Sequence, residues 1–170
     1  RLSLVLVDPD RTGGDDRHVP VRQRSLDGPA PAEPPPRIRP GHARAIIARA
    51  LTDAWLPAGG FAYTLGHGGA VADGSRFWWP VTEAITALAT LIRIDGQDAD
   101  AAWYRRLWQF ADAHFIDHAR GGWYPAIDDA GAPTGSIFNG KPDIYHSLQA
   151  CLFPATGRIS RMAGALPTLS

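Results

Sequence analysis

The chain has 170 residues, and its 17 basic and 17 acidic side chains give a formal net charge of zero at pH 7. A neutral chain has no overall field to recruit nucleic acid or an anionic membrane, so we expect neither partner and predict a small, neutral or weakly charged ligand. One cysteine, Cys151, excludes a disulfide within these residues and a zinc site built from cysteines, and it is typical of a reducing cytoplasm. No apolar run reaches the length of a membrane span.

Residues 1–40 differ in composition from the rest of the chain. They contain eight prolines, from Pro9 to Pro40, with scattered arginines and little apolar periodicity. Such a segment cannot bury enough apolar surface to offset its conformational entropy. We therefore expect residues 1–40 to be irregular or disordered and residues 41–170 to form the folded domain.

Helical periodicity begins after this segment. Helices are predicted over residues 42–55, 80–95, 98–118 and 142–153. The second helix carries an apolar stripe of Val81, Ile85, Leu88 and Ile92, and Gly96 marks its end. The fourth is expected to have Pro142 at its first position and Pro154 after its last.

An internal repeat lies between these helices. "GGFAYTL" begins at Gly59 and "GGWYPAI" begins at Gly121, an offset of 62 residues that also carries Gly69 onto Gly131. Each unit is a Gly-Gly-aromatic turn, a short extended segment, a second turn and a proline-started helix. Repeated helix pairs stack because one pair cannot bury its own apolar face, so the sequence predicts an all-α toroid or solenoid.

Three of the helices follow a proline and carry an ionisable group near their start: His42, Glu83 and His146. The helix over residues 98–118 has no such group. We therefore expect the first three to be inner helices whose N-terminal ends converge on one mouth. Free backbone N–H groups and the helix dipole favour oxygen-rich ligands there.

Single residues leave alternatives open. A lone histidine such as His146 is more often structural than catalytic, and Trp78 and Trp79 are as consistent with a core as with a sugar-stacking surface. His114 and His118 have a spacing that zinc can use, but the sequence places no third ligand near them. We expect no metal site.

Five segments taken in order resemble one family: "GGFAYTL", "FWWPVTEAI", "WYRRLWQFADAHFID", "RGGWYPAIDDAGAP" and "GKPDIYHSLQACL". They are similar to the C-terminal part of the N-acylglucosamine 2-epimerase family, which includes mannose isomerases, over about residues 45–165. The resemblance implies part of an (α/α)6 barrel with short extended hairpins between helix pairs. It also implies proton transfer at C2 of an unphosphorylated sugar, without metal or cofactor.

The resemblance implies site residues as well. His146 and His42 match the family's pair of acid/base histidines, and Glu83 matches an acidic residue that binds a hydroxyl or sets a pKa. After "PGH" the family has a glutamate three residues on, where this sequence has Ala45. Four further residues are assigned to sugar binding: Trp78, Trp79, Lys141 and Tyr145.

Two other hypotheses remain at this point. The chain is alternatively an inactive fragment of such a barrel, whose exposed helix edges would lead to a homodimer or to self-association. A glycoside hydrolase on the same barrel is the third option, and it requires two carboxylates that flank the glycosidic bond. Glu83 has no clear partner for that role, because Asp143 lies on another helix.

Overall fold

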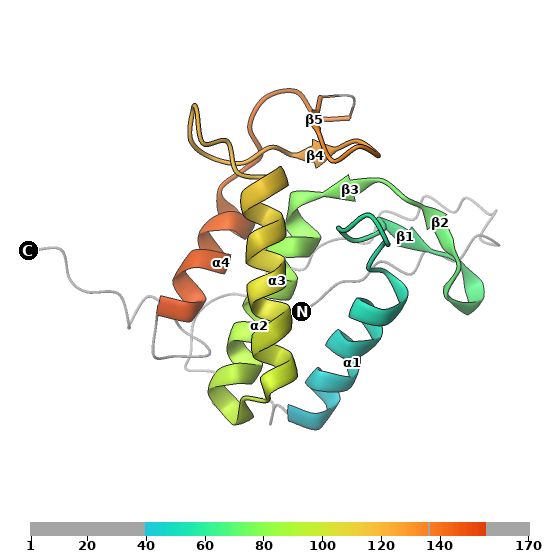
Figure 1. Ribbon diagram of the computed structural model, residues 1–170, viewed down its shortest axis with the longest axis vertical. Coiled ribbons are helices and arrows are strands. Elements are labelled where there is room, and N and C mark those ends of the chain that lie inside the picture. Colours follow the sequence, from blue (N-terminus) through green and yellow to red (C-terminus); the bar gives the residue numbers. More distant parts are fainter. Residues whose placement is uncertain (1–39, 136, 156–170) are drawn as a thin grey trace, which may run out of the picture.

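The computed structural model describes residues 40–135 and 137–155 of the chain (Figure 1). The irregular segment expected over residues 1–40 lies outside this part, apart from Pro40. The elements in chain order are α1 (Pro40–Asp53), β1 (Thr64–Leu65), the 3-10 helix η1 (His67–Gly69), β2 (Val71–Asp73), β3 (Arg76–Phe77), α2 (Trp78–Asp95), α3 (Asp98–His114), β4 (Ala126–Ile127), β5 (Pro133–Thr134) and α4 (Tyr145–Ala155).

All four predicted helices are present. Among their first residues, that of α4 differs most from the predicted one. α4 begins at Tyr145, so the expectation that Pro142 is its first residue is wrong. The reason is local: the Asp143 carboxylate accepts the backbone N–H of Tyr145 at 2.8 Å, and the first helical hydrogen bond runs from the Leu148 N–H to the Ile144 carbonyl at 2.8 Å. Pro154 lies inside the last turn of α4 rather than beyond it.

α2 is the central helix and packs against α1, α3 and α4. Val81, Ile85 and Leu88 of the predicted stripe are at most 1% exposed, and Ile92 is half-buried. Each large apolar side chain withdrawn from water contributes roughly 1.5–3 kcal/mol, so this stripe is the main reason α2 is held in place. Within the described residues, no helix combines the length and apolar character that a membrane crossing requires.

The 62-residue repeat is confirmed by the backbone. The Gly66 N–H donates to the Ala70 carbonyl at 2.7 Å, and the Asp128 N–H donates to the Ala132 carbonyl at 2.9 Å, two bonds related by that offset. Both Gly-Gly turns have positive φ values, 85° at Gly59 and 74° at Gly121, where a side chain would be strained. We refer to residues 40–95 as the first repeat and to residues 98–155 as the second.

The repeat also corrects the expected grouping of the helices. Because α1 and α3 each precede a Gly-Gly turn, they are equivalent, whereas α2 and α4 follow the strands. Figure 1 shows α1 and α3 running toward the strands and α2 and α4 running away from them. The start of α1 therefore lies at the opposite end of the bundle, where Arg44 donates to Asp95 at the end of α2 and to Asp100 at the start of α3. The expectation that three helix N-termini converge is wrong for α1.

A three-stranded antiparallel sheet, in the order β3-β4-β5, joins the two repeats. β3 pairs with β4, and β3 leads directly into α2, whose first N–H, on Trp78, donates to the Pro125 carbonyl at 3.3 Å. β1 and β2 form a separate hairpin. The strands thus fix the start of α2, and no strand of the described residues lies immediately before α4.

Candidate active site

The structure brings Glu83 and His146 together. Glu83 lies in the second turn of α2, and His146 is the second residue of α4. His146 Nδ1 is 2.7 Å from Glu83 Oε1, and the two side chains are 27% and 21% exposed. Two neighbouring helices that start at the same end of the bundle therefore hold a carboxylate and an imidazole within one hydrogen bond, partly shielded from water.

The direction of this hydrogen bond sets the chemistry of the ring. An ionised carboxylate only accepts, so His146 Nδ1 donates its proton to Glu83. In the neutral imidazole the lone pair then lies on Nε2, and that nitrogen is able to take a proton from a bound molecule. The arrangement is that of a general base whose orientation is fixed by a carboxylate.

Aromatic rings surround the pair. The Trp79 ring lies 6.1 Å from the His146 ring at 38°, Trp78 contacts the same ring edge-on at 6.1 Å, and Tyr145 at 4.8 Å. Trp79 is half-buried and Tyr145 is 64% exposed, so both present ring surface beside the imidazole. Trp78 is only 7% exposed and belongs to the core, where it also contacts Phe138.

Lys141, expected to bind sugar, is engaged with protein groups. Its ammonium forms an ion pair with Asp117, whose side chain is 2% exposed, and lies 4.5 Å from the Tyr124 ring centroid. Lys141 is the largest cause that lowers the pKa of Asp117 to about 2, and the backbone N–H groups of Arg120 and Ala119 add to the effect. The role of Asp117 could not be recognised from the repeat in the sequence, because Leu56 occupies the equivalent position in the turn of the first repeat.

The other predicted histidines lie elsewhere. His42 is exposed near the start of α1, at the far end of the bundle from His146. His114 Nδ1 is 2.9 Å from the Gly131 carbonyl, whereas His118 contacts Asp112. The two rings therefore contact different partners and do not form a shared site. Over residues 40–135 and 137–155, no group of three or more side chains is arranged to hold a metal ion.

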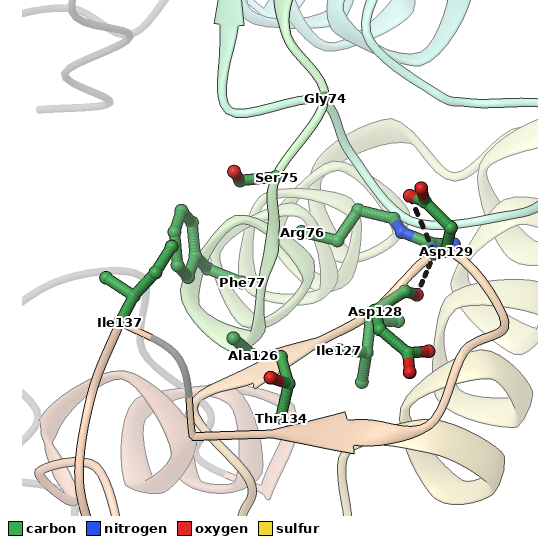
Figure 2. Close-up of a pocket in the computed structure, with 10 residues that line it drawn as sticks. All are labelled: Gly74, Ser75, Arg76, Phe77, Ala126, Ile127, Asp128, Asp129, Thr134 and Ile137. Atoms are coloured by element: carbon green, nitrogen blue, oxygen red, sulfur yellow. Dashed lines mark hydrogen bonds and ion pairs between the residues drawn. The ribbon is translucent and has the colours of Figure 1, made fainter.

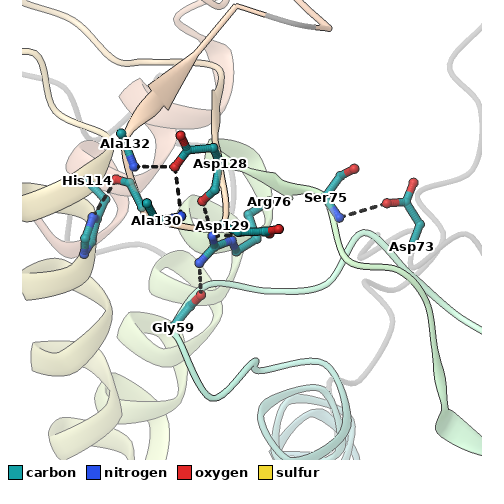
Figure 3. A network of polar contacts seen from close by, with 10 residues as sticks. Gly59, Asp73, Ser75, Arg76, His114, Asp128, Asp129, Ala130 and Ala132 are labelled. Carbon is teal, nitrogen blue, oxygen red and sulfur yellow. Dashed lines mark hydrogen bonds and ion pairs between the residues drawn. The ribbon is translucent and has the colours of Figure 1, made fainter.

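A cavity of about 240 Å³ lies at the β3-β4-β5 sheet and contains neither Glu83 nor His146 in its wall (Figure 2). Arg76 lies in its wall and is 3% exposed. The guanidinium donates to the Gly59 carbonyl at 3.1 Å and to the Asp128 carbonyl, and these two bonds, drawn in Figure 3, join the turns of the two repeats. Arg76 therefore has a structural role, and the Glu83–His146 pair is the candidate site.

Two helix pairs joined by short strands make the chain part of an (α/α)6 barrel, and its candidate site is the pair of His146 and Glu83. The sequence model of the family described as N-acylglucosamine 2-epimerase (GlcNAc 2-epimerase) matches residues 30–150, and the chain belongs to this family. The expected family and fold class are confirmed.

Individual relatives are consistent with this assignment. The chain is 37% identical over 138 residues to a D-mannose isomerase of Thermobifida fusca, covering 79% of this chain and 34% of the relative. It is 33% identical over 129 residues to a D-mannose isomerase of Pseudomonas cannabina pv. alisalensis, covering 75% and 31%. The chain therefore spans about a third of the length of these relatives.

Solved structures show the same fold. A crystal structure of D-mannose isomerase superposes with a TM-score of 0.63 at 26% identity and covers 68% of this chain and 30% of that one. Cellobiose 2-epimerase from Spirochaeta thermophila superposes with a TM-score of 0.54 at 24% identity, covering 65% and 28%, which shows a likeness of fold alone.

Proposed function

We propose that this chain is part of a sugar isomerase that moves a proton at C2 of an unphosphorylated aldose of the mannose type. The observation that carries the proposal is the 2.7 Å hydrogen bond from His146 Nδ1 to Glu83 Oε1. Membership of the family and the names of its relatives support the choice of substrate.

The residues suggest a sequence of steps. His146 Nε2 removes the C2 proton of the open-chain aldose, and the electrons of the broken C–H bond form an enediolate with the carbonyl. Glu83 keeps the imidazole in place and stabilises the imidazolium that results. The same Nε2 returns the proton to C1 on the same face of the enediol, and a proton shift from the C2 hydroxyl to the C1 oxygen completes the ketose. Trp79 and Tyr145 offer apolar ring faces to the C–H surfaces of the sugar.

The geometry favours isomerisation over epimerisation for these residues. Epimerisation at C2 requires a second acid that delivers a proton to the opposite face. His42, the predicted second histidine, lies at the other end of the bundle, so the proposed mechanism relies on His146 alone. Lys141 is paired with Asp117 and has no direct role in binding sugar in this mechanism.

The cellular setting is part of the proposal. We place the reaction in a reducing cytoplasm and in carbohydrate metabolism, which agrees with the single cysteine and with the sugar-acting relatives. The inactive-fragment hypothesis is a second candidate, and the presence or absence of turnover distinguishes it from the isomerase.

Product analysis tests the proposal. The purified chain is incubated with mannose, N-acetylmannosamine or cellobiose, and the sugars are followed by ¹³C NMR. We expect fructose from mannose and no product from the other two. N-acetylglucosamine as the product would indicate an epimerase, glucose from cellobiose a hydrolase, and no product at all an inactive fragment.

A further inference from the structure

The second repeat holds the start of its inner helix differently from the first. In the first repeat, β3 runs directly into α2, and Arg76 ties this junction to the Gly59 carbonyl of its own Gly-Gly turn at 3.1 Å. In the second repeat, no strand of the described residues lies between β5 and α4. The chain that leads to His146 therefore needs another means of being fixed.

Lys141 supplies that connection. It lies five residues before His146, and its ammonium pairs with Asp117 beside the second Gly-Gly turn. Its stem also packs against this turn, because a Cβ added at Gly122 would lie 3.8 Å from Lys141 Cδ. Each repeat thus has a cation shortly before its second helix that contacts the Gly-Gly turn of the same repeat. Arg76 donates to a carbonyl before α2, and Lys141 pairs with a carboxylate before α4.

Asp117 is built into its turn. Its Oδ1 accepts the backbone N–H groups of Ala119 and Arg120 at 3.1 and 3.0 Å, which leaves Oδ2 for Lys141. Its own N–H donates to the Gly122 carbonyl at 2.9 Å. Because the side chain is 2% exposed and held by three donors, it is a rigid anchor rather than a mobile surface charge.

The backbone between Lys141 and His146 is restricted in conformation. Pro142 has a restricted φ angle, and Asp143 Oδ1 accepts the Tyr145 N–H at 2.8 Å, so few free torsions separate the ammonium from the first turn of α4. His146 follows directly, and its Nδ1 forms a 2.7 Å hydrogen bond to Glu83 that orients the ring. A small displacement of this turn changes that bond.

We infer that Lys141 and Asp117 are positioning residues for His146: their ion pair sets the start of α4 and thereby the Glu83–His146 hydrogen bond. The inference rests on the proposed function for its catalytic meaning, but the geometric claim is measurable without turnover. Neither residue is expected to touch the sugar, so their loss should affect kcat and leave substrate affinity nearly unchanged.

The test uses Lys141→Met, Lys141→Arg and Asp117→Asn, with Arg49→Met as the matched control. Arg49 also pairs with an aspartate, Asp53, but it is 74% exposed on α1 and lies in the first repeat. In ¹⁵N-histidine-labelled protein, the Nδ1–H signal and the tautomer of His146 are recorded by NMR. Steady-state kcat and KM are measured in parallel.

We expect Lys141→Met and Asp117→Asn to lose the single Nδ1–H tautomer of His146, and Lys141→Arg and Arg49→Met to keep it. kcat should fall on the order of tenfold to a hundredfold in the first two variants, with KM within about twofold. An unchanged His146 signal in Lys141→Met, or an equal change in Arg49→Met, would overturn the inference. If Lys141→Met is unfolded by circular dichroism, Asp117→Asn decides by the same readouts, because an asparagine oxygen still accepts the turn N–H groups.

The two proposals can fail separately, because turnover tests the isomerase function and the His146 NMR signal tests the positioning role. Without turnover in the unmodified chain, the isomerase proposal fails, whereas the His146 signal in the four variants still supports or overturns the positioning role.

Discussion

His146 Nδ1 lies 2.7 Å from Glu83 Oε1, although the two residues are 63 positions apart in the chain. The contact exists because α2 and α4 are equivalent helices of two successive repeats, packed side by side with the same direction. Each repeat contributes one member of the pair, so neither repeat alone contains the site.

Glu83→Gln should reduce kcat by about a hundredfold or more. A glutamine oxygen still accepts the Nδ1 proton, but it has no charge to stabilise the imidazolium that forms when Nε2 takes a proton. Steady-state kinetics with mannose measure the effect. Asp112→Asn is the control, because Asp112 also contacts a histidine, His118, at 3.2 Å, but on the exposed surface of the second repeat. Equal losses in both variants would contradict the assigned role.

Trp79→Leu should raise KM up to about tenfold and change kcat much less, since in the proposed mechanism the ring stacks beside the sugar and takes no proton. Trp103→Leu provides the comparison. Trp103 is a half-buried tryptophan on α3 whose ring lies 4.6 Å from the Arg106 guanidinium carbon. A fall in kcat with an unchanged KM in Trp79→Leu would show that the ring positions His146 rather than the substrate.

The Asp117 carboxylate gives a pH-dependent term in the free energy of unfolding. Its pKa is lowered from 3.8 to about 2, with the Lys141 ammonium as the largest cause. Because the folded pKa lies below the unfolded one, the stabilisation is fully present above about pH 5 and is lost as the pH falls toward 2.

Urea unfolding of the unmodified chain and of Asp117→Asn between pH 7 and pH 2.5 measures this term. The difference in unfolding free energy should be constant from pH 7 down to about pH 5 and shrink below that. Asp129→Asn, which alters a fully exposed carboxylate, should show a small difference throughout. A difference for Asp117→Asn that is unchanged at pH 2.5 would contradict the ion pair.

Gly59→Ala should destabilise the fold more than Gly68→Ala. Both glycines have positive φ, 85° and 82°, so an alanine costs about 1–2 kcal/mol at either position. A Cβ at Gly59 would also lie 2.5 Å from Phe110 Cε2, whereas nothing lies within 4 Å at Gly68. Overpacking adds roughly 1–3 kcal/mol at Gly59. Thermal unfolding compares the two, and equal costs would mean that Phe110 moves aside freely.

Periodic features were predictable from the sequence. The apolar stripe on α2 and the 62-residue repeat define the helices and the family of folds, because burial and turn geometry leave their pattern in the residues themselves. The exception was α1, which we grouped with α2 and α4 because a proline and a histidine stand near its start. The direction of a helix within a repeat depends on the turn that follows it, and "GGF" after α1 was the available signal.

Contacts between side chains were less predictable. The role of Lys141 depends on Asp117, which is 24 residues away and has no counterpart in the first repeat. Trp78 and Trp79 are neighbours in the sequence, yet one is buried and the other half-buried, because successive residues of a helix face different directions.

Exchange of the C2 proton of mannose in deuterated water shows whether His146 is the base that removes this proton. The unmodified chain, His146→Ala and His42→Ala are each incubated with the sugar, and loss of the C2–H signal is followed by ¹H NMR. We expect exchange in the unmodified chain and in His42→Ala, and none above background in His146→Ala. Exchange that persists in His146→Ala, or that disappears in His42→Ala, would contradict it.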